Sequence, residues 1–260
     1  MSIEQLAILA SLFFSLSANT LFFSSALAGR PPGSPHTWLF AISIFVAITA
    51  LHAAGLFVVL NRWTAKPLLA ILLVVTALAA YYMSKYTVFF NTEMVRNVLK
   101  TDVKEASELL SPGMLLHLLL FAVLPVIVVW RLPLRYRPWR RALMVRIAYI
   151  VGALLLAAGA IMLVFQDFSS LMRNQKEVRF LITPSNYLVS AAKVLSADTS
   201  ESGPRIPISA DAKLQQSWAK RSKPMLFVLV VGETTRAANW GLNGYAHQTT
   251  PELAQLDILN

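Results

Sequence analysis

Hydrophobic residues fill five long stretches of the chain, and polar residues collect between them. The stretches are Leu6–Ala28, Trp38–Leu60, Pro67–Met83, Met114–Trp130 and Ile147–Phe165. As helices, they are long enough to cross or nearly cross the ~30 Å hydrocarbon core of a bilayer. The pattern therefore predicts a membrane α-helical bundle with five transmembrane helices over residues 1–165, of which the third and fourth are short.

Composition agrees with a membrane protein. Of 260 residues, 56% are hydrophobic and only 14% are charged, which is too apolar for a soluble domain of this length. A net charge of +10 would suggest nucleic acid as the partner of a soluble protein, but here the arginines lie next to the spans. We therefore expect an anionic bilayer surface as the partner, and no nucleic acid.

Ionisable residues are almost absent from the spans. The exceptions are His52 and His117. A lone intramembrane histidine is most often bonded to a neighbouring helix, and we interpret both in this way. Because no acidic or basic partner accompanies them, a proton-coupled transporter is not expected.

The basic residues predict the orientation of the bundle. Six arginines lie in the short segment from Arg131 to Arg146, between the fourth and fifth spans, and Arg62 and Lys66 lie between the second and third. The positive-inside rule places both segments in the cytoplasm. The N-terminus is then inside, and everything after Phe165 is outside.

The first span has an alternative interpretation as a signal peptide, since Ala26-Leu27-Ala28 resembles a signal-peptidase site. Against cleavage, the residues before Leu6 include Glu4 and no Lys or Arg, and the apolar run is long for a signal peptide. We favour an uncleaved helix.

The loop Ser84–Gly113 carries polar residues at a regular spacing. Asn91 or Thr92 is expected to cap a helix in which Asn97, Thr101 and Glu105 recur every four residues. On one continuous helix, these three form a polar stripe that can bind a phospholipid headgroup. Alternatively, Thr101 or Asp102 caps a second helix, with Asp102 and Glu105 forming a capping box. The residues alone favour this alternative.

After Phe165 the character of the chain changes. Residues 166–223 alternate short basic amphipathic pieces with breakers, among them Thr183-Pro184 as a helix start and a loop at Gly203-Pro204 and Pro207. The pieces are expected to bridge the spans to a soluble domain. They either rest on an anionic membrane surface or form a solvated linker.

The segment from Met225 to Val231 is an unbroken apolar run that predicts a strand buried in a parallel sheet. It stops at Gly232, and Glu233 follows where ligands gather beyond the carboxyl end of a strand. A carboxylate in that place can bind a divalent metal. The alternative is a glycine turn in which Thr234 or Thr235 caps a helix that begins at Arg236. The residues alone do not decide between the metal site and the helix cap.

The string VVGETTRAANWGLNGYAHQTTPELA closely resembles the opening of the catalytic domain of the lipid A phosphoethanolamine transferases, the family that includes the mobile colistin-resistance enzymes. One departure is His247, where relatives usually carry arginine. The resemblance implies that residues 224–260 begin an α/β alkaline-phosphatase-like, sulfatase-like domain that is truncated at Asn260. It also implies that Glu233 is a zinc ligand.

The resemblance extends to the loop Ser84–Gly113 and reverses its interpretation. The family's NxxxTxxxE pattern is met at Asn97, Thr101 and Glu105, which in the family line the substrate pocket. By resemblance, a threonine nucleophile takes phosphoethanolamine from phosphatidylethanolamine and passes it to a lipid A phosphate. The nucleophile and the other zinc ligands are expected beyond Asn260, so this chain is expected to hold no catalytic residue.

The setting implied by the resemblance is the bacterial inner membrane, with the C-terminal part in the periplasm, and the outcome is resistance to polymyxins. Two alternatives remain open. One is a related periplasmic phospho- or sulfo-ester hydrolase or a transferase with another acceptor, such as a core sugar. The other is a truncated, noncatalytic membrane protein.

Overall fold

The computed structural model describes residues 1–135, 137–200, 213, 228–229 and 236–256. The chain divides into two compact units, Met1–Gly203 and Pro204–Asn260. In the part of the chain that is described, every regular element longer than a single bridge is helical. In the second unit these are three short 3-10 helices: η3 (Ala237–Asn239), η4 (Gly241–Asn243) and η5 (Leu253–Gln255).

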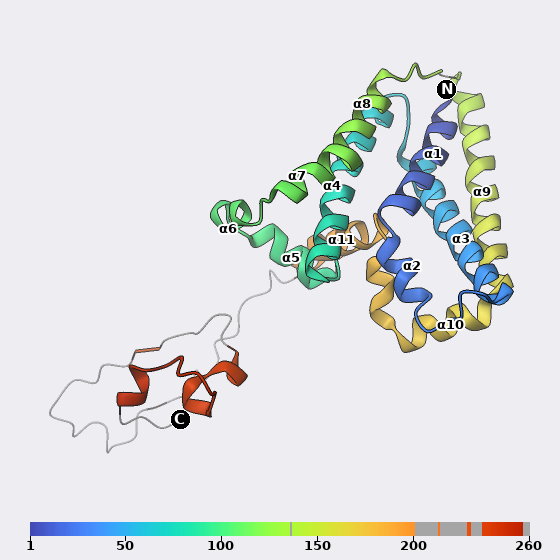
Figure 1. Ribbon diagram of the computed structural model, residues 1–260. Helices are drawn as coiled ribbons and strands as arrows, with labels where there is room; N and C mark the ends of the chain where they lie inside the picture. Colours follow the sequence, from blue (N-terminus) through green and yellow to red (C-terminus); the bar gives the residue numbers. More distant parts are fainter. Residues whose placement is uncertain (136, 201–212, 214–227, 230–235, 257–260) are drawn as a thin grey trace. The chain divides into compact units, whose positions relative to one another are not determined.

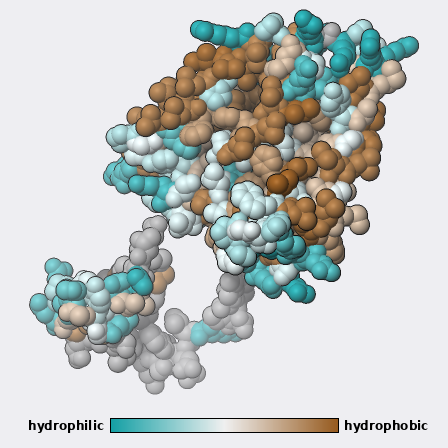
Figure 2. Space-filling view, turned by 45° about the vertical axis from the view of Figure 1, so that its right-hand side comes forward, coloured by the Kyte–Doolittle hydropathy of each residue, from teal (hydrophilic) through white to brown (hydrophobic). Residues whose placement is uncertain are grey.

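Four helices of the first unit are long and apolar enough to span a bilayer, and a bent pair passes the same test when its two helices are taken together. The four are α3 (Pro35–Val59), α4 (Ala65–Tyr86), the composite helix Pro112–Arg131 and α9 (Trp139–Leu163). Figure 2 shows a broad hydrophobic belt on the face in view, with hydrophilic residues at its rims. The five-span bundle predicted from the sequence is thus confirmed, and the chain is a multi-pass membrane protein.

The first span is broken. Helix α1 (Ile3–Ser17) and helix α2 (Thr20–Ala26) meet at 58°, so the stretch predicted at Leu6–Ala28 is not one continuous helix. Asn19 lies at the break with no exposed surface. Its side-chain amide donates to the carbonyls of Phe14 at 2.9 Å and Thr183 at 2.7 Å, and its Oδ1 accepts from the Thr183 N–H at 2.9 Å. These bonds pair both backbone groups of Thr183 and connect the bend to the segment just before α11.

The fourth span combines three helical pieces: α7 (Pro112–Leu118), the π-helix η1 (Leu119–Val123) and α8 (Leu124–Arg131). Pro125 accounts for the π-helix, since proline has no N–H to donate and its ring crowds the carbonyl four residues earlier. Widening the preceding turn relieves that crowding. The span is therefore longer than the predicted Met114–Trp130 and remains one helix.

The arginine-rich segments gather at the end of the bundle that holds the N-terminus (Figure 1). Helix α9 begins at Trp139, well before the predicted Ile147, so several arginines lie on its first turns. The N-terminal amine donates to the Pro133 carbonyl at 3.0 Å, and the Arg135 N–H donates to the Met1 carbonyl at 2.9 Å. This end of the structure thus contains every segment that the charge pattern assigns to one side of the membrane.

The opposite end of the bundle carries α10 (Phe165–Asn174), the 3-10 helix η2 (Lys176–Leu181) and α11 (Ser185–Ser200). These pieces bury apolar residues in the core of the first unit: Leu171, Val178, Leu181, Tyr187 and Val194. The described part of the predicted linker thus packs against the spans. Contact of these pieces with an anionic membrane surface stays a prediction, and the predicted loop at Gly203-Pro204 and Pro207 lies outside the described residues.

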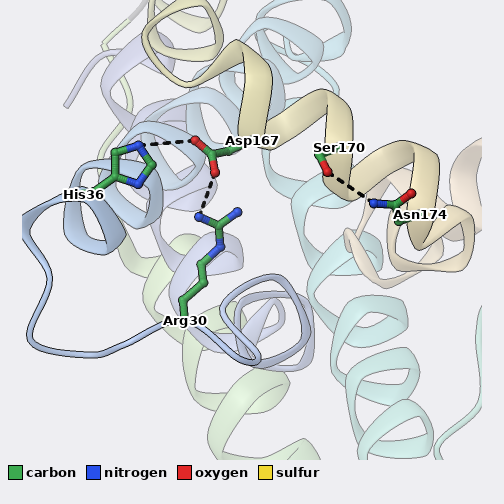
Figure 3. Close-up of polar contacts among 5 residues, drawn as sticks. All are labelled: Arg30, His36, Asp167, Ser170 and Asn174. Atoms are coloured by element: carbon green, nitrogen blue, oxygen red, sulfur yellow. Dashed lines mark hydrogen bonds and ion pairs between the residues drawn. The ribbon is translucent and has the colours of Figure 1, made fainter.

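Ion pairs fix the start of α10. Asp167 accepts from the Arg30 guanidinium at 3.0 Å and lies 3.4 Å from His36 Nε2 (Figure 3). The guanidinium also lies 3.8 Å from the centre of the Phe40 ring. One turn further on, Asn174 Nδ2 donates to the Ser170 hydroxyl at 3.2 Å. The loop between α2 and α3 is thereby held to the beginning of α10.

Candidate functional site

Two short helices, α5 (Thr92–Lys100) and α6 (Val103–Glu108), form an arm between α4 and α7 (Figure 1). Asn91 caps α5 as predicted, its side-chain oxygen accepting from the Met94 N–H at 2.9 Å. Val95 is buried, and α5 packs against α11. Helix α6 buries none of its residues.

The helix is interrupted between Thr101 and Asp102, so the polar stripe does not lie on one continuous helix as we had expected. Thr101 is extended, with φ −61° and ψ 130°, and Asp102 caps α6 by accepting from the Glu105 N–H at 2.9 Å. The alternative of a second helix is therefore correct, and Asp102 is its cap. The reason is local, because the Asp102 carboxylate satisfies an N–H that would otherwise need a carbonyl of the preceding turn.

Asn97, Thr101 and Glu105 are all exposed on this arm. The Thr101 hydroxyl donates to the Asn97 carbonyl at 2.8 Å, and the Thr101 N–H donates to the same oxygen at 2.9 Å. Among the described residues, no hydrogen-bond partner is found for the Asn97 side-chain amide or the Glu105 carboxylate. One donor-bearing amide and one carboxylate thus remain available to a ligand, which leaves headgroup binding as a prediction.

A cluster of tyrosines lies where α4 faces α7, and the sequence analysis does not predict it. Tyr81 shares a 2.7 Å hydrogen bond with Ser111, the residue that caps α7. Tyr82 donates to the Leu109 carbonyl at 3.4 Å and stacks on Tyr86, with ring centres 5.8 Å apart. The sequence signal for this cluster is the pair of tyrosines at positions 82 and 86, because residues one helical turn apart lie on the same face. They fix the far end of the arm to the bundle.

Helix α11 places several of its residues against the spans, where they bond polar side chains of α3 and α4. His52 of α3 hydrogen-bonds Ser185 at 3.1 Å, and Thr76 of α4 bonds the Tyr187 hydroxyl at 3.1 Å. Burial raises the pKa of Tyr187 to about 12, although the Thr76 hydrogen bond opposes the shift. The helical partner expected for His52 is thus confirmed.

His117 lies beside aromatic rings. The Tyr81 ring centre of the neighbouring α4 lies 5.6 Å from that of His117, and the hydrogen bond expected between His117 and a neighbouring helix stays a prediction. The Phe121 ring centre is 4.5 Å away. His117 Nε2 and His52 Nδ1 are buried without a hydrogen-bond partner in the described part of the chain.

In the second unit, the structure describes the family-like string from Arg236 onward, and several of its residues form turns. Gly244 of Asn243-Gly244-Tyr245 has φ 87°, a left-handed conformation that favours glycine. The Thr249 hydroxyl donates to the Asn239 carbonyl at 2.6 Å and accepts from the Gly241 N–H at 3.0 Å. His247 is exposed, and its ring centre lies 5.5 Å from that of Tyr245.

Glu233, Thr234 and Thr235 lie outside the described residues, as does most of the predicted strand Met225–Val231. Its two described residues, Val228 and Leu229, are exposed and carry no regular structure. At Arg236, where the alternative began a helix, the described chain is extended before η3. No group of three or more His, Cys, Asp or Glu residues within the described ranges is arranged to hold a metal ion.

Comparisons with known proteins all match transferases of one kind. A family model described as "Phosphoethanolamine transferase EptA/EptB" matches residues 48–199. The chain is 29% identical to the phosphoethanolamine transferase EptA of Escherichia coli K12 and 31% identical to the phosphatidylethanolamine transferase Mcr-2 of Escherichia coli, matches that cover 97% and 96% of this chain. They cover 46% and 47% of the relatives, so the chain spans about half their length.

A solved structure is also similar. It is the integral membrane protein lipooligosaccharide phosphoethanolamine transferase A (EptA) from Neisseria meningitidis, which matches with a TM-score of 0.82 and 32% identity. The match covers 96% of this chain and 46% of that one. The likeness thus extends over nearly the whole of the chain, including the membrane bundle and the arm.

Proposed function

The chain belongs to the phosphoethanolamine transferase EptA/EptB family, and on that premise we propose that it forms the membrane part of an enzyme that transfers phosphoethanolamine from phosphatidylethanolamine to a lipid A phosphate. The observation that carries the proposal is likeness over 96–97% of the chain to two transferases whose names specify phosphoethanolamine. The name of Mcr-2 supports the donor, and the lipooligosaccharide transferase supports an acceptor of the lipid A class.

The proposed setting is the periplasmic face of the bacterial inner membrane. The positive-inside rule supports it, because the arginine-rich end then faces the cytoplasm and the arm formed by α5 and α6 faces the periplasm. Adding a cationic group to a lipid A phosphate lowers the negative charge of the cell surface. Polycationic antimicrobials such as polymyxins then bind less tightly.

In this proposal the arm binds the donor headgroup. The Glu105 carboxylate pairs with the ammonium of the headgroup, and the Asn97 amide donates to a phosphate oxygen. The Thr101 hydroxyl is engaged with the Asn97 carbonyl, so it must rotate away before it donates to the same phosphate. The break at Asp102 means that the ammonium and phosphate contacts come from different helices.

Zinc is part of the proposal, with Glu233 as one ligand. It rests on the resemblance around Gly232, Glu233 and Thr234, because those residues lie outside the described ranges. When bound, zinc would activate the nucleophile and stabilise charge on the phosphoryl oxygens. The described residues of this chain contribute donor binding rather than metal binding.

The test is mass spectrometry of lipid A from cells that express the complete gene. We expect phosphoethanolamine-modified lipid A from the unaltered gene, and at least about a tenfold lower yield from Glu105→Gln at limiting donor, the effect of losing one charged hydrogen bond. Glu108→Gln is the matched control, since it neutralises a carboxylate one turn away on the same exposed helix.

Unmodified lipid A, despite correctly inserted protein, would contradict the reaction. Equal yields of modified lipid A from Glu105→Gln and Glu108→Gln would still support the transfer reaction but would contradict the role of Glu105 in binding the headgroup. A different modified product, on a core sugar or with another group, would instead support the alternative acceptor or ester chemistry.

Orientation has its own test. Single cysteines at Lys104 and Arg137 can be labelled with a membrane-impermeant thiol reagent in intact spheroplasts, because the chain has no cysteine of its own. We expect labelling at position 104 and none at position 137. The reverse pattern would place the arm in the cytoplasm and remove it from lipid A.

A further inference from the structure

A cavity of about 580 Å³ lies at the arginine-rich end of the bundle, between the start of α1, the segment after α3 and the start of α9. Four arginines line it: Arg62, Arg135, Arg137 and Arg146. Glu4 is the single carboxylate among its described lining residues, and it pairs with Arg137 at 3.2 Å. The cavity therefore carries an excess of three positive charges.

A second, apolar cavity of about 510 Å³ lies further along α1 and α9 and is also lined by α3. On α9, Arg146 of the basic cavity is followed at helical spacing by Tyr149 and Ala153 of the apolar one. On α1, Glu4 is followed in the same way by Ile8. Since residues three or four apart share a helix face, the two cavities are consecutive sections of one groove.

The groove has α3 as its floor. Helix α3 packs against both α1 and α9, which form the walls (Figure 1). Lining residues on α3 run from Phe45 to Phe57, a rise of about 18 Å at 1.5 Å per residue. This is close to one leaflet, about half of a ~30 Å hydrocarbon core.

The packing leaves the groove open rather than filling it. Gly152 of α9 lines the apolar section, and a Cβ built there would meet nothing within 4 Å. The absence of a side chain at Gly152 thus leaves space in the groove. On α9, the lining of the apolar section begins at Ala148, two residues after Arg146 of the basic cavity.

We propose that this groove binds an anionic phospholipid, with the phosphate among the arginines and an acyl chain along α3. Charge complementarity selects the headgroup, since an excess of three positive charges attracts a phosphate and repels the ammonium of a zwitterionic headgroup. The apolar section selects a lipid over free phosphate, because phosphate alone gains nothing from it. The site is separate from the arm and does not depend on the proposed transfer reaction.

The test is native mass spectrometry of the purified protein in detergent, with phosphatidylglycerol, phosphatidylethanolamine or inorganic phosphate added. Phosphatidylglycerol is expected to be retained at about a tenfold lower concentration than phosphatidylethanolamine. The double variant Arg62→Gln/Arg146→Gln is expected to lose at least about tenfold in phosphatidylglycerol affinity. Arg140→Gln/Arg141→Gln is the matched control, because it removes the same charge from α9 outside the lining of the cavity.

A second pair tests the acyl section without changing charge. Gly152→Leu places a side chain in the groove and is expected to weaken phosphatidylglycerol retention several-fold, while Gly159→Leu, on the same helix and also in open space, leaves it unchanged. If the arginine variant fails to fold, the two glycine variants and the lipid preference of the unaltered protein still test the proposal.

Three results would overturn the proposal. The first is equal retention of phosphatidylglycerol and phosphatidylethanolamine by the unaltered protein. The second is an equal effect of the two arginine pairs or of the two glycine variants. The third is full displacement of the lipid by inorganic phosphate at a similar concentration, which would show a free-phosphate site.

Discussion

Two sets of polar residues in the first unit have opposite environments. Asn19, Thr183 and Asn186 form a buried polar joint where the α1–α2 break meets the start of α11, and their side chains bond one another or nearby carbonyls. Asn97 and Glu105 stand exposed on the arm, with no partner for their side chains among the described residues. Similar residue types thus hold the fold together in one place and are free to meet a ligand in the other.

The difference lies in the cost of an unpaired group. A buried amide without a partner loses its hydration and gains nothing, whereas an exposed amide stays bonded to water until a ligand displaces it. Substitution in the buried joint should therefore change stability, and substitution on the arm should change function. The predictions below separate the two consequences, from the largest expected effect to the smallest.

The largest effect is expected for Asn19→Ala. The change removes three hydrogen bonds and leaves the Thr183 N–H and carbonyl without their partner in a fully buried place. We expect a loss on the order of 3 kcal/mol in the free energy of unfolding, measured by denaturation in detergent. Ser24→Ala, an exposed change on α2, should stay within about 0.5 kcal/mol. Equal effects would show that Asn19 does not stabilise the bend.

The joint marks a limit of inference from sequence. The spans were predictable because an apolar run of about 20 residues carries its own information on length and composition. The bend at Asn19 was not, because its partner Thr183 is 164 positions away. The pairs between His52 and Ser185 and between Thr76 and Tyr187 were unpredictable for the same reason, and they hold α11 against α3 and α4.

A pH effect of similar or smaller size is expected from Tyr187. Its pKa is about 12 in the folded protein against 10.0 for an unperturbed tyrosine, so the folded state holds the phenolic proton more tightly. That stability is fully present below pH 10 and is lost as the pH rises from 10 to 12, at most about 3 kcal/mol. Tyr187→Phe should flatten this alkaline loss.

The measurement is denaturation at a series of alkaline pH values, with tyrosinate absorbance followed in parallel. An identical alkaline loss in the Tyr187→Phe protein would assign the effect to other groups. Because Tyr187 bonds α4 from the buried side of α11, the result bears on the bundle and not on the arm.

A smaller effect is expected at the link between the two regions. The Ser190 hydroxyl of α11 is buried and donates to the Phe90 carbonyl, just before α5, at 3.0 Å. Ser190→Ala leaves that carbonyl unpaired and should cost about 1 kcal/mol. Hydrogen exchange at the start of α5 should rise with it. Ser196→Ala, exposed on the same helix, is the control, and equal exchange in both variants would contradict the link.

The arm shows a second limit of inference from sequence. The four-residue spacing of Asn97, Thr101 and Glu105 is correct for one face of a helix, but it ignores Asp102, which offers its carboxylate to the Glu105 N–H and begins a new helix. The capping signal was present in the residues, and the family pattern outweighed it. The pattern places these residues near one another in the chain, while the cap decides how they are oriented.

The smallest effect on global stability is expected for Asp102→Ala. Loss of an N-cap costs about 1 kcal/mol of helix stability, but α6 buries no residue, so its opening exposes no core. The free energy of unfolding of the whole unit should therefore change by less than about 0.5 kcal/mol, while amide hydrogen exchange across Val103–Glu108 rises about fivefold. Asp102→Asn keeps a capping oxygen and should leave exchange close to that of the unaltered protein. A global loss as large as that of Asn19→Ala would show that the arm is part of the structural core, and the contrast between the two regions would not hold.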